Sequence, residues 1–596
     1  MDNFEDNCVE NNQKVIKQQP ESQSDEWFQI WSNYLSHSPF KIGEKNEQSH
    51  CVMQKVLEAT LQGDSCIETS SEDIQQLEDL ALAEHLVSKT QIAPFIYDEQ
   101  YLYLYRYWAL ENSLAKQVGH LKKQDIPPIS LQGIDDLLSD PYQKKAVEIV
   151  AKNSLSMITG GPGTGKTYTL ARIIAILNQA YPNIRIALAA PTGKAAQRMK
   201  EALQNSFNDE KLETFLSPEL KNITPITIHR LLGLGNQHQP KFNAKQPLPY
   251  DLIIIDEASM LDLNLANMLF LAIPDQARLI LLGDAQQLAS VDVGNVLADL
   301  QDIKALAENR VNLVTSRRFK DGALIGEMAK FIQAQTAQDY ANVLEKFESA
   351  IVPATTLQAI ALSTDMPDTI QLEYLPEETP YGTTWDVYYD QLFYGFDSYV
   401  QAIQHYINQD NLDVSVDHVV KRFDDYRILT AIRHSALGLS MLNLQMEQRF
   451  LAKSNQIKQG DWYVGRPVMM TYNDYQLGLS NGDIGICLKR HDFNNAPFEV
   501  YFPSLEKWIL ATRLPKNIET AYVLTIHKSQ GSEFKHTAVV LDEMATKLLS
   551  KELIYTAITR AKSVVSLLVN KTAFRTALTT KTLRKSGLLS KINILF

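Results

Sequence analysis

The sequence predicts an α/β fold in which parallel sheets are flanked by helices. Apolar runs of strand length, such as Ile184–Ala190 and Ala277–Leu282, alternate with longer segments of helical periodicity. This alternation is typical of parallel sheets, which bind ligands at the carboxyl ends of their strands. Short strands with Gly and Asn turns return over about 445–518 and predict a small β-barrel insert. We therefore expect two α/β lobes, a mostly helical N-terminal domain and one β-rich insert.

The composition is that of a large globular protein. With 596 residues, of which 45% are hydrophobic, the chain has room for about four domains of ~150 residues. Because no apolar run approaches about 18 residues and the N-terminus is polar, we expect neither a membrane span nor a signal peptide. The four cysteines show no C-x-x-C spacing, which fits a reducing cytoplasm.

The negative charge is concentrated at one end of the chain. Residues 1–125 contain 21 acidic and 10 basic side chains, or −11, and the whole chain carries −13, which leaves −2 for the remainder. A nearly neutral remainder can still hold a basic groove, because phosphate contacts are local. We interpret the asymmetry as a boundary and predict an acidic docking domain over 1–125, with about 20 disordered residues at its start.

Helical patterns dominate this first segment. Trp27, Ile30, Trp31 and Leu35 are spaced as one helical face, and a second helical pattern runs from Ile74 to Leu86. Side chains alternate strictly in type over Tyr101–Trp108, which first indicates a strand. The helical spacing of apolar residues continues to Leu121, so a helix is also possible. Exposed aromatic rings can stack on bases, but the acidic surroundings favour packing in the core or on a partner.

A glycine-rich loop follows a predicted strand and precedes a predicted helix. It matches the pattern G-x-x-x-x-G-K-[ST] and consists of Gly160, Gly161, Pro162, Gly163, Thr164, Gly165, Lys166 and Thr167. Glycines let backbone N–H groups surround phosphate oxygens at the start of a helix. Lys166 would reach the β- and γ-phosphates, and the Thr167 hydroxyl would bind Mg²⁺. A chance match is disfavoured by the flanking pattern, so the loop predicts a nucleotide site.

Three further positions fit the chemistry of nucleotide hydrolysis. Gln143 lies upstream of the loop, where its amide can read the adenine edge, although alone it would be a solvated helix residue. The apolar run from Tyr250 ends in Asp256 and Glu257. Asp256 can hold Mg²⁺ through its hydration shell, and Glu257 can polarise the attacking water as a general base. Gln287, after the strand that ends at Leu282, is a candidate sensor of the γ-phosphate.

Other segments predict contacts to a nucleic-acid backbone. The strand that ends at Ala190 leads into Pro191–Ala196, where Thr192 and Lys194 are the expected phosphate donors, with a plain strand–helix turn as the alternative. His229 is either an interface histidine or a DNA contact. The polar, turn-rich segment 233–249 predicts a small hairpin that projects from the core.

The second half of the chain contains two further motifs of the kind that contacts phosphate. No chemical motif is found in residues 331–425, but Thr525–Phe534 and Tyr555–Arg560 follow strand signals and predict a second RecA-like lobe. Arg560 is placed to act as an arginine finger, which stabilises charge on the transferring phosphoryl group. Arg317 and Arg318 form a basic pair that lies either on the surface or in the site.

These stretches, in this order, resemble the motifs of superfamily 1 helicases. The match is closer still to the RecD subunits of bacterial exodeoxyribonuclease V, the RecBCD complex. The stretches that carry it are Thr227–Gly233, Asp256–Met260, Gly465–Val468, Asn473–Asp474, Leu477–Gly485 and Thr525–Phe534. The resemblance covers about 140–596. It implies a first RecA-like lobe over 126–335 with a short 1B hairpin at 233–249. A second lobe over 336–596 would contain the β-rich insert, and ATP would bind between the lobes.

The resemblance also assigns roles to residues. Lys166, Thr167, Asp256 and Glu257 would carry out hydrolysis. The family's γ-phosphate sensors would correspond to Gln287, Arg318, Gly531, Glu533 and Arg560, with Arg318 chosen because it precedes Phe319. The DNA-backbone contacts would be Thr192, Lys194, His229, Thr525, His527 and Ser529. The family implies 5′→3′ translocation on DNA with ATP and Mg²⁺, and the short hairpin would be a reduced strand-separating pin.

Partners follow from the same resemblance. The family implies a heterotrimer with RecB and RecC that acts in double-strand-break repair by homologous recombination and in degradation of linear DNA. No cluster of carboxylates with Lys is left after the ATPase acids are assigned, so the nuclease site is expected in RecB.

Two alternatives stay open. The chain can be a stand-alone RecD-like or RNA-directed superfamily 1 helicase, although such relatives tend to carry a longer N-terminal extension. It can also be a structural subunit with a vestigial ATPase. Intact Lys166, Glu257, Gln287 and Arg560 disfavour that second alternative.

Overall fold

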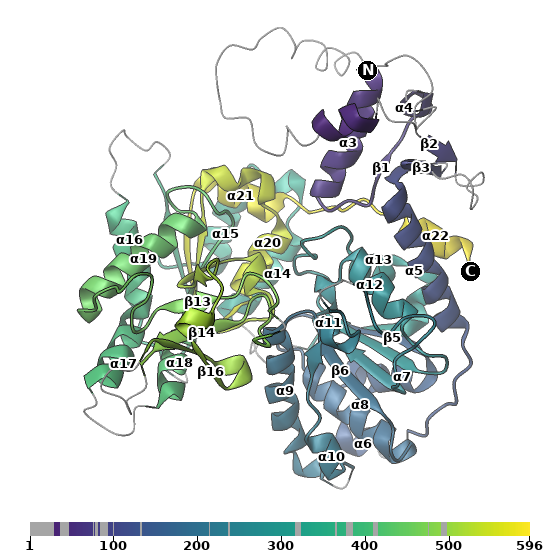
Figure 1. The fold of residues 1–596 in the computed structure, drawn as a ribbon, viewed down its shortest axis with the longest axis horizontal. Helices are drawn as coiled ribbons and strands as arrows, with labels where there is room; N and C mark the ends of the chain where they lie inside the picture. The colour runs from purple at the N-terminus through teal and green to yellow at the C-terminus, as the bar shows by residue number, and fades with distance from the viewer. Residues whose placement is uncertain are drawn as a thin grey trace.

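The chain forms two parallel sheets that lie beside each other, with the N-terminal region above one of them (Figure 1). The computed structural model describes residues 29–35, 47–75, 77, 81–83, 93–98, 100–131, 134–213, 215–235, 239–315, 323–363, 366–376, 385–408, 415–474, 476–489 and 497–596. Among these residues, no helix is long and apolar enough to cross a membrane. The predicted α/β fold with two RecA-like lobes is confirmed.

The first lobe is built on a six-stranded sheet in the order β10-β5-β9-β8-β6-β7, in which every pair is parallel. Its strands are β5 (Leu155–Gly160), β6 (Ile186–Ala190), β7 (Ile226–Thr227), β8 (Leu252–Ile255), β9 (Arg278–Gly283) and β10 (Arg310–Leu313). Its helices include α6 (Ile134–Leu137), α7 (Pro141–Lys152), α8 (Lys166–Ala180), α9 (Gly193–Phe207), α10 (Pro218–Lys221), α11 (Ile228–Leu231), α12 (Leu263–Leu271) and α13 (Val296–Asp302).

The continuous apolar runs of this sheet reflect burial on both of its faces. Successive side chains of a strand point to opposite faces, so Ile253 and Ile255 pack in one core cluster and Leu252 and Ile254 in another. Helices cover both faces, as expected for an all-parallel sheet. The carboxyl ends of β5 and β8 therefore lie at one edge, where the glycine-rich loop and the acidic pair begin.

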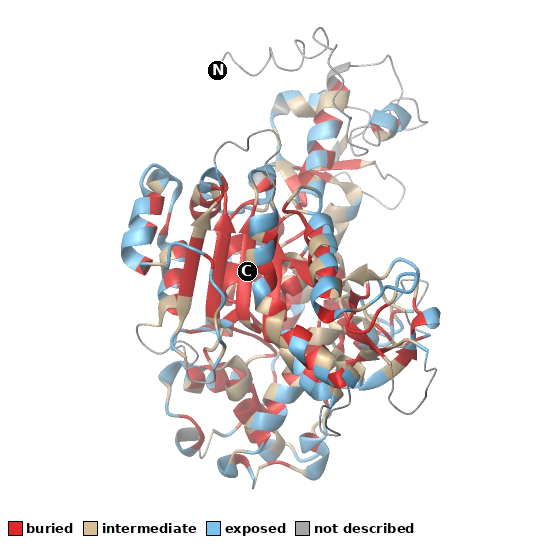
Figure 2. Ribbon diagram, turned by 90° about the vertical axis from the view of Figure 1, so that its left-hand side faces the viewer, coloured by how far each residue is buried: buried red, intermediate tan, exposed pale blue. Residues whose placement is uncertain are grey.

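The second lobe repeats this plan on a five-stranded parallel sheet in the order β11-β20-β19-β12-β18. Its strands are β11 (Thr369–Tyr374), β12 (Tyr426–Thr430), β18 (Val523–Thr525), β19 (Phe534–Leu541) and β20 (Ala561–Val569). Its helices are α14 (Leu324–Ala334), α15 (Val343–Ile351), α16 (Asp386–Phe393), α17 (Asp397–Asn408), α18 (Val416–Asp424), α19 (Leu439–Ser454), α20 (Lys551–Ile558) and α21 (Lys571–Thr579). Figure 2 shows its buried strands between helices whose outer faces are exposed.

Residues 331–425, which carry no chemical motif, supply β11 and several helices of this second lobe. Although the predicted first lobe extends to residue 335, Ile325 and Met328 of α14 pack in the core of the second lobe. The chain therefore crosses from the first lobe to the second before Leu324, where α14 begins.

The β-rich insert is a five-stranded antiparallel sheet in the order β16-β15-β14-β13-β17. Its strands are β13 (Pro467–Met469), β14 (Ile484–Leu488), β15 (Glu499–Phe502), β16 (Lys507–Leu510) and β17 (Glu519–Thr520), and they enclose a core of their own around Val468 and Val500. The predicted strands are present, but the predicted start near residue 445 is wrong, because residues up to Ser454 belong to α19 and the first strand begins at Pro467. Closure into a barrel is not confirmed and stays a prediction.

The N-terminal region is mostly helical, as predicted, but it also contains an unpredicted four-stranded sheet in the order β1-β4-β3-β2. Its elements are a helix over 29–35, α3 (Glu47–Leu61), β1 (Cys66–Glu68), α4 (Ser71–Gln75), β2 (Ala81–Ala83), β3 (Phe95–Asp98), β4 (Tyr101–Leu104) and α5 (Tyr105–Lys123). The helix expected from Ile74 to Leu86 is wrong at 81–83, because β2 pairs with β3 there. The segment 101–108 is a strand to Leu104 and then a helix. Trp27, Leu86 and the first 20 residues lie outside the described residues.

The end of the chain returns from the second lobe to the N-terminal region. Figure 1 shows the last segment crossing from α21 to α22 (Leu588–Ile594), which lies against α5. The Lys591 ammonium donates to Asp98 (3.0 Å), Glu111 (3.1 Å) and the Tyr103 hydroxyl (2.8 Å). Lys591 is 8% exposed and Glu111 is 1% exposed. Lys591 and Glu111 therefore form a buried ion pair, which we call the junction, and this pair holds α22 against α5.

We expect Lys591→Met to loosen this junction, because it leaves the buried Glu111 carboxylate without its cation. Breaking a buried pair by removing one partner costs about 3–5 kcal/mol. Hydrogen–deuterium exchange should show faster exchange in Leu588–Ile594 and in the facing part of α5. Lys585→Met is the matched control, since Lys585 is half exposed and its pair with Glu68 spans 3.5 Å. Equal exchange in the two variants would contradict a stabilising role for the junction.

Candidate active site and nucleic-acid groove

The glycine-rich loop joins β5 to α8 in the geometry that the motif requires. Gly165 precedes the helix with φ 82°, a left-handed conformation that favours glycine. Lys166 begins α8, and its ammonium donates to the carbonyl oxygens of Gly160 (2.6 Å) and Gly161 (3.2 Å). Thr167 follows in the first turn of α8. The loop therefore places a cation and a helix N-terminus together, which is an anion site.

Gln143 approaches this loop from α7. Asp140 caps that helix by accepting from the backbone N–H groups of Tyr142 and Gln143. A Cβ atom at Gly165 would lie 2.8 Å from Gln143 Nε2, so the amide lies against the loop. Gln143 is 2% exposed, and its Oε1 has no hydrogen-bond partner among the described residues. A buried amide that lacks a partner fits a nucleobase, which offers both donors and acceptors.

The acidic pair lies where β8 ends. Asp256 accepts a hydrogen bond from the backbone N–H of Glu257 (2.9 Å), and Glu257 has a left-handed φ of 51°. Such a conformation is unfavourable for a residue other than glycine and is common at functional sites. Burial, together with the neighbouring Glu257 carboxylate, raises the pKa of Asp256 to about 6, against the opposing effect of Lys166. A cation at Asp256 would relieve both penalties, so the pair fits a Mg²⁺ site next to the loop.

A cleft of about 1060 Å³ opens in front of the loop and is lined by both lobes. The first lobe contributes Gly160, Gly161 and Asp284, and the second contributes Tyr555 and Thr559 of the α20 region. Gln287 is buried, and its Nε2 donates to Asp284 (3.2 Å). The Tyr555 hydroxyl donates to the same carboxylate (3.0 Å). The predicted γ-phosphate sensor Gln287 therefore lies where the lobes meet.

The predicted sensors of the second lobe, Arg560, Gly531 and Glu533, do not line this cleft. The Arg560 guanidinium donates to the carbonyl oxygens of Thr556 (3.0 Å) and Ser532 (3.3 Å) and is buried. Gly531 has a left-handed φ of 68°. Glu533 lies 3.7 Å from Arg198 of the first lobe. Arg560 is therefore held by its own lobe in this structure, and Arg318 lies outside the described residues.

A second and larger groove, of about 1350 Å³, runs between the lobes. Five of the six predicted DNA-backbone residues line it: Thr192, Lys194, His229, Thr525 and His527. Ser529 does not line it, because the residue is fully buried and its hydroxyl donates to the carbonyl oxygen of Ile526 (2.7 Å). The groove brings together residues that are more than 300 positions apart in the sequence.

The groove also contains basic residues that the sequence reasoning missed, namely Arg230, Arg433, Lys528 and Arg584. Arg230 and Lys528 are the sequence neighbours of the predicted His229 and His527, and this adjacency could have identified them as groove residues. Arg433 and Arg584 lie outside the motifs, and only the fold brings them to the groove. Together with Lys194, the four basic residues give the groove five cations from both lobes, beside the carboxylates of Asp64, Asp262, Asp292 and Asp474, and these cations are suited to a phosphate backbone.

Lys194 lies near the start of α9, which Thr192 caps by accepting from the N–H of Ala195. Its ammonium lies 5.3 Å from the centre of the Phe534 ring of the second lobe. Burial lowers the pKa of Lys194 to about 8; Arg427 and Arg198 act in the same direction, while Asp424 and Asp483 oppose them. A bound phosphate would favour the charged form.

The predicted hairpin at 233–249 is very short. Its only ladder among the described residues is the antiparallel bridge between Asn243 and Gln246. Phe242 is half-buried against the first-lobe core, and its N–H donates to the Leu232 carbonyl (3.1 Å). The aromatic side chain of this segment is therefore packed on the core and does not project from it.

Known proteins match both lobes. A family model described as an AAA domain matches residues 143–293, and one described as a UvrD-like helicase C-terminal domain matches residues 520–568. The chain is 33% identical over 556 residues to the RecBCD enzyme subunit RecD of Haemophilus influenzae, covering 84% of this chain and 81% of that protein. The chain belongs to the RecD family. The RecD subunit of Mycobacterium tuberculosis is 32% identical, with 83% and 80% covered.

A more distant RecD-family relative is the ATP-dependent RecD2 DNA helicase of Deinococcus radiodurans. It is 29% identical over 471 residues, which cover 77% of this chain and 54% of that protein. The span of the AAA-domain match includes the glycine-rich loop, the acidic pair and Gln287, and that of the C-terminal match includes Thr525 and Arg560. Both matches include residues that line the cleft, namely Gly160 and Gly161 in the first and Tyr555 and Thr559 in the second.

We expect binding of single-stranded DNA to weaken as the pH rises through about 8, because Lys194 is then neutral in the free chain and binding requires uptake of a proton. Below this pH the lysine is charged before and after binding, so its contribution is fully present. Fluorescence anisotropy with a labelled oligothymidine between pH 7 and 9, at constant salt, measures the effect. Lys194→Arg stays charged and should show a shallower pH dependence. Identical slopes for the two proteins would exclude Lys194 as the titrating contact.

Proposed function

We propose that the chain is an ATP-dependent 5′→3′ DNA helicase and translocase, and that it acts as the RecD-type subunit of a RecBCD complex. The observation that carries the proposal is that the nucleotide cleft and the larger groove are both lined by the same two lobes. A change in the arrangement of the lobes at the cleft must therefore change the groove. This coupling is what a motor needs to convert hydrolysis into movement along a strand.

The residues of the cleft support nucleotide hydrolysis in named roles. Lys166 and the N–H groups at the start of α8 would bind the β- and γ-phosphates, and Gln143 would contact the base. Thr167 and Asp256 would hold Mg²⁺, which neutralises charge on the phosphates when bound. Glu257 would accept a proton from the attacking water. The residues that would respond to the γ-phosphate are Gln287, Arg318, Gly531, Glu533 and Arg560.

The groove supports binding of a single strand through its backbone. Thr192, Lys194 and His229 from the first lobe would contact one stretch of phosphates, and Thr525 and His527 from the second lobe would contact the next. Contacts from two lobes allow one lobe to hold the strand while the other moves. Because these contacts go to phosphates, we expect no sequence preference from them.

Assembly with RecB and RecC is part of the proposal. Proteins named as RecBCD enzyme subunits are 32–33% identical to this chain over more than four-fifths of its length. We assign the docking of partners to the acidic N-terminal region and the nuclease to RecB. In a complex of this kind the chain would serve repair of double-strand breaks and degradation of linear DNA.

We expect Lys166→Gln to lower DNA-stimulated ATP hydrolysis by at least about 100-fold, because it removes the cation that stabilises charge on the transferring phosphate. A phosphate-release assay on the purified chain measures the loss. The variant should still co-purify with two larger subunits, since among the described residues the Lys166 ammonium donates to its own loop. Lys152→Gln, at the exposed end of α7, is the control and should retain full activity. Undiminished turnover in Lys166→Gln would refute the ATPase assignment.

The direction of movement can be tested with tailed duplexes. We expect ATP-dependent strand separation on substrates with a 5′ single-stranded tail and little on substrates with a 3′ tail. A gel or fluorescence-quenching assay with the two substrates, matched in duplex sequence, gives the answer. Activity on the 3′-tailed substrate alone would reverse the proposed polarity while leaving the ATPase assignment intact.

A further inference from the structure

The segment that carries Gln287 is held by side chains of the opposite lobe. We call residues 284–288, which follow β9, the sensor loop. The backbone N–H of Leu288 donates to Thr556 Oγ1 (2.8 Å), and the Leu288 carbonyl accepts from Gln530 Nε2 (2.7 Å). Both polar backbone groups of the residue next to Gln287 are therefore bonded to the second lobe. Leu288, Gln530 and Thr556 are all buried, so water is a poor substitute for these bonds.

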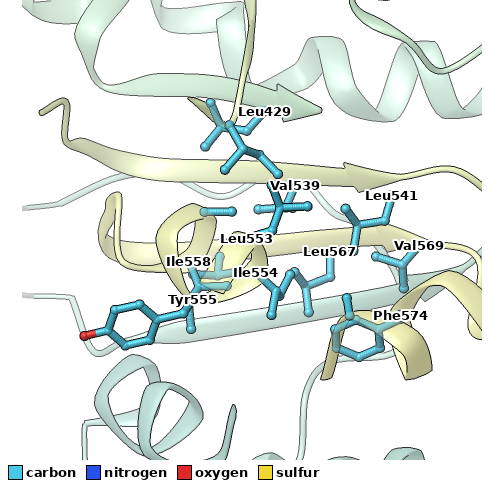
Figure 3. Packing of buried hydrophobic residues seen from close by; sticks show 14 of the residues in the cluster. Leu429, Val539, Leu541, Leu553, Ile554, Tyr555, Ile558, Leu567, Val569 and Phe574 are labelled. Carbon is cyan, nitrogen blue, oxygen red and sulfur yellow. The ribbon is translucent and has the colours of Figure 1, made fainter. Parts of the chain in front are cut away.

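A third bond joins the other end of the sensor loop to the same helix. Tyr555 donates its hydroxyl to Asp284, the residue that also accepts from Gln287 Nε2. Figure 3 shows Tyr555 at one end of the apolar cluster, with its hydroxyl directed away from Leu553, Ile554 and Ile558. The Tyr555 oxygen also lies where a Cβ atom at Gly161 would be 3.1 Å away. Tyr555 therefore contacts both the sensor loop and the glycine-rich loop.

Thr556 links the two predicted sensors of the γ-phosphate. Its side chain holds the sensor loop, and its own carbonyl oxygen accepts from the Arg560 guanidinium (3.0 Å). Gln287 Oε1 is buried and has no hydrogen-bond partner among the described residues. Such an orphaned acceptor in an otherwise bonded network indicates a group that is supplied by the ligand or its attacking water.

We propose that Thr556, assisted by Tyr555, is a positioning residue that aligns Gln287 and Arg560 across the cleft, so that hydrolysis requires the lobes to be packed against each other. This inference rests on the proposed ATPase function. When the lobes separate, the Leu288 N–H loses its acceptor and Asp284 loses the tyrosine, so the sensor loop is no longer held in one orientation. Misplacement of a catalytic group by about 1 Å can cost about 100-fold in rate.

The proposal separates the chemical step from nucleotide binding. The Thr556 hydroxyl accepts from the Leu288 N–H of the sensor loop, and its carbonyl oxygen accepts from Thr559 and Arg560. Removal of its hydroxyl should therefore lower kcat and leave the KM for ATP nearly unchanged. A variant that merely destabilises the fold would lower the amount of active protein and would not restore activity when a hydroxyl is returned.

The test compares three substitutions in the full-length chain, with single-stranded DNA present at saturation. Thr556→Val has the same shape but no acceptor, and we expect its kcat to fall about tenfold. Thr556→Ser restores the oxygen and should return kcat to within about twofold of the parent. Thr537→Val is the matched control, because Thr537 is fully buried in β19 and its hydroxyl has no partner among the described residues. That control should leave kcat and KM unchanged.

Equal kcat values for Thr556→Val and Thr537→Val would overturn the inference, as would an increased KM for ATP with an unchanged kcat. Tyr555→Phe gives an independent measurement if Thr556→Val does not fold, and it too should lower kcat at constant KM. An active Lys166→Gln chain would instead refute the ATPase function itself. If Lys166→Gln abolishes hydrolysis but Thr556→Val leaves kcat unchanged, only the positioning role is refuted.

Discussion

The buried hydrogen bonds between the sensor loop and the second lobe are the constraint on which the rest of the structure depends. Each lobe has its own sheet and its own apolar core, so hydrophobic burial explains why each lobe folds. Between the lobes, Leu288 of the sensor loop packs in the apolar cluster of the second lobe. The orientation of that loop is set by a few polar contacts at the edge where the strands of the first lobe end. Polar contacts can be broken and remade at lower cost than a packed core, which suits a joint that must move.

Buried polar atoms without partners are informative about function in this molecule. Gln143 Oε1, Gln287 Oε1, Ser259 Oγ and Ser532 Oγ lack hydrogen-bond partners among the described residues. Other orphaned atoms, such as Ser156 Oγ and Thr537 Oγ1, lie in the buried strands β5 and β19. A native fold satisfies nearly all its buried polar groups. Gln143 Oε1 and Gln287 Oε1 differ from those strand atoms because they adjoin the glycine-rich loop and the sensor loop, which agrees with a site that a nucleotide completes.

Much of the fold and of the site could be predicted from local sequence, since both depend on short-range patterns. The apolar run that ends at Ile255 indicates a buried strand, because both faces of that strand are covered. The glycines before Lys166 determine the conformation of the loop locally. The N-terminal sheet was missed because β2 is only three residues long and exists through its pairing with β3. The burial of Ser529 and the groove position of Arg433 also depend on contacts that are distant in sequence, which no local pattern records.

The return of the chain to the first lobe adds a second tie at the same joint. Arg584 follows the last helix of the second lobe, and its guanidinium donates to the carbonyl oxygens of Ser290, Asp292 and Gly294. These residues follow the sensor loop directly. Residues 284–294 are therefore held by the second lobe through α20 at one end and through the returning chain at the other. Beyond Arg584 the chain reaches Lys591 and its junction with Glu111, so a movement of the second lobe that shifts the sensor loop also acts on the N-terminal region. The same contacts that make hydrolysis depend on the lobes thereby connect the motor to the region to which we assign partner docking.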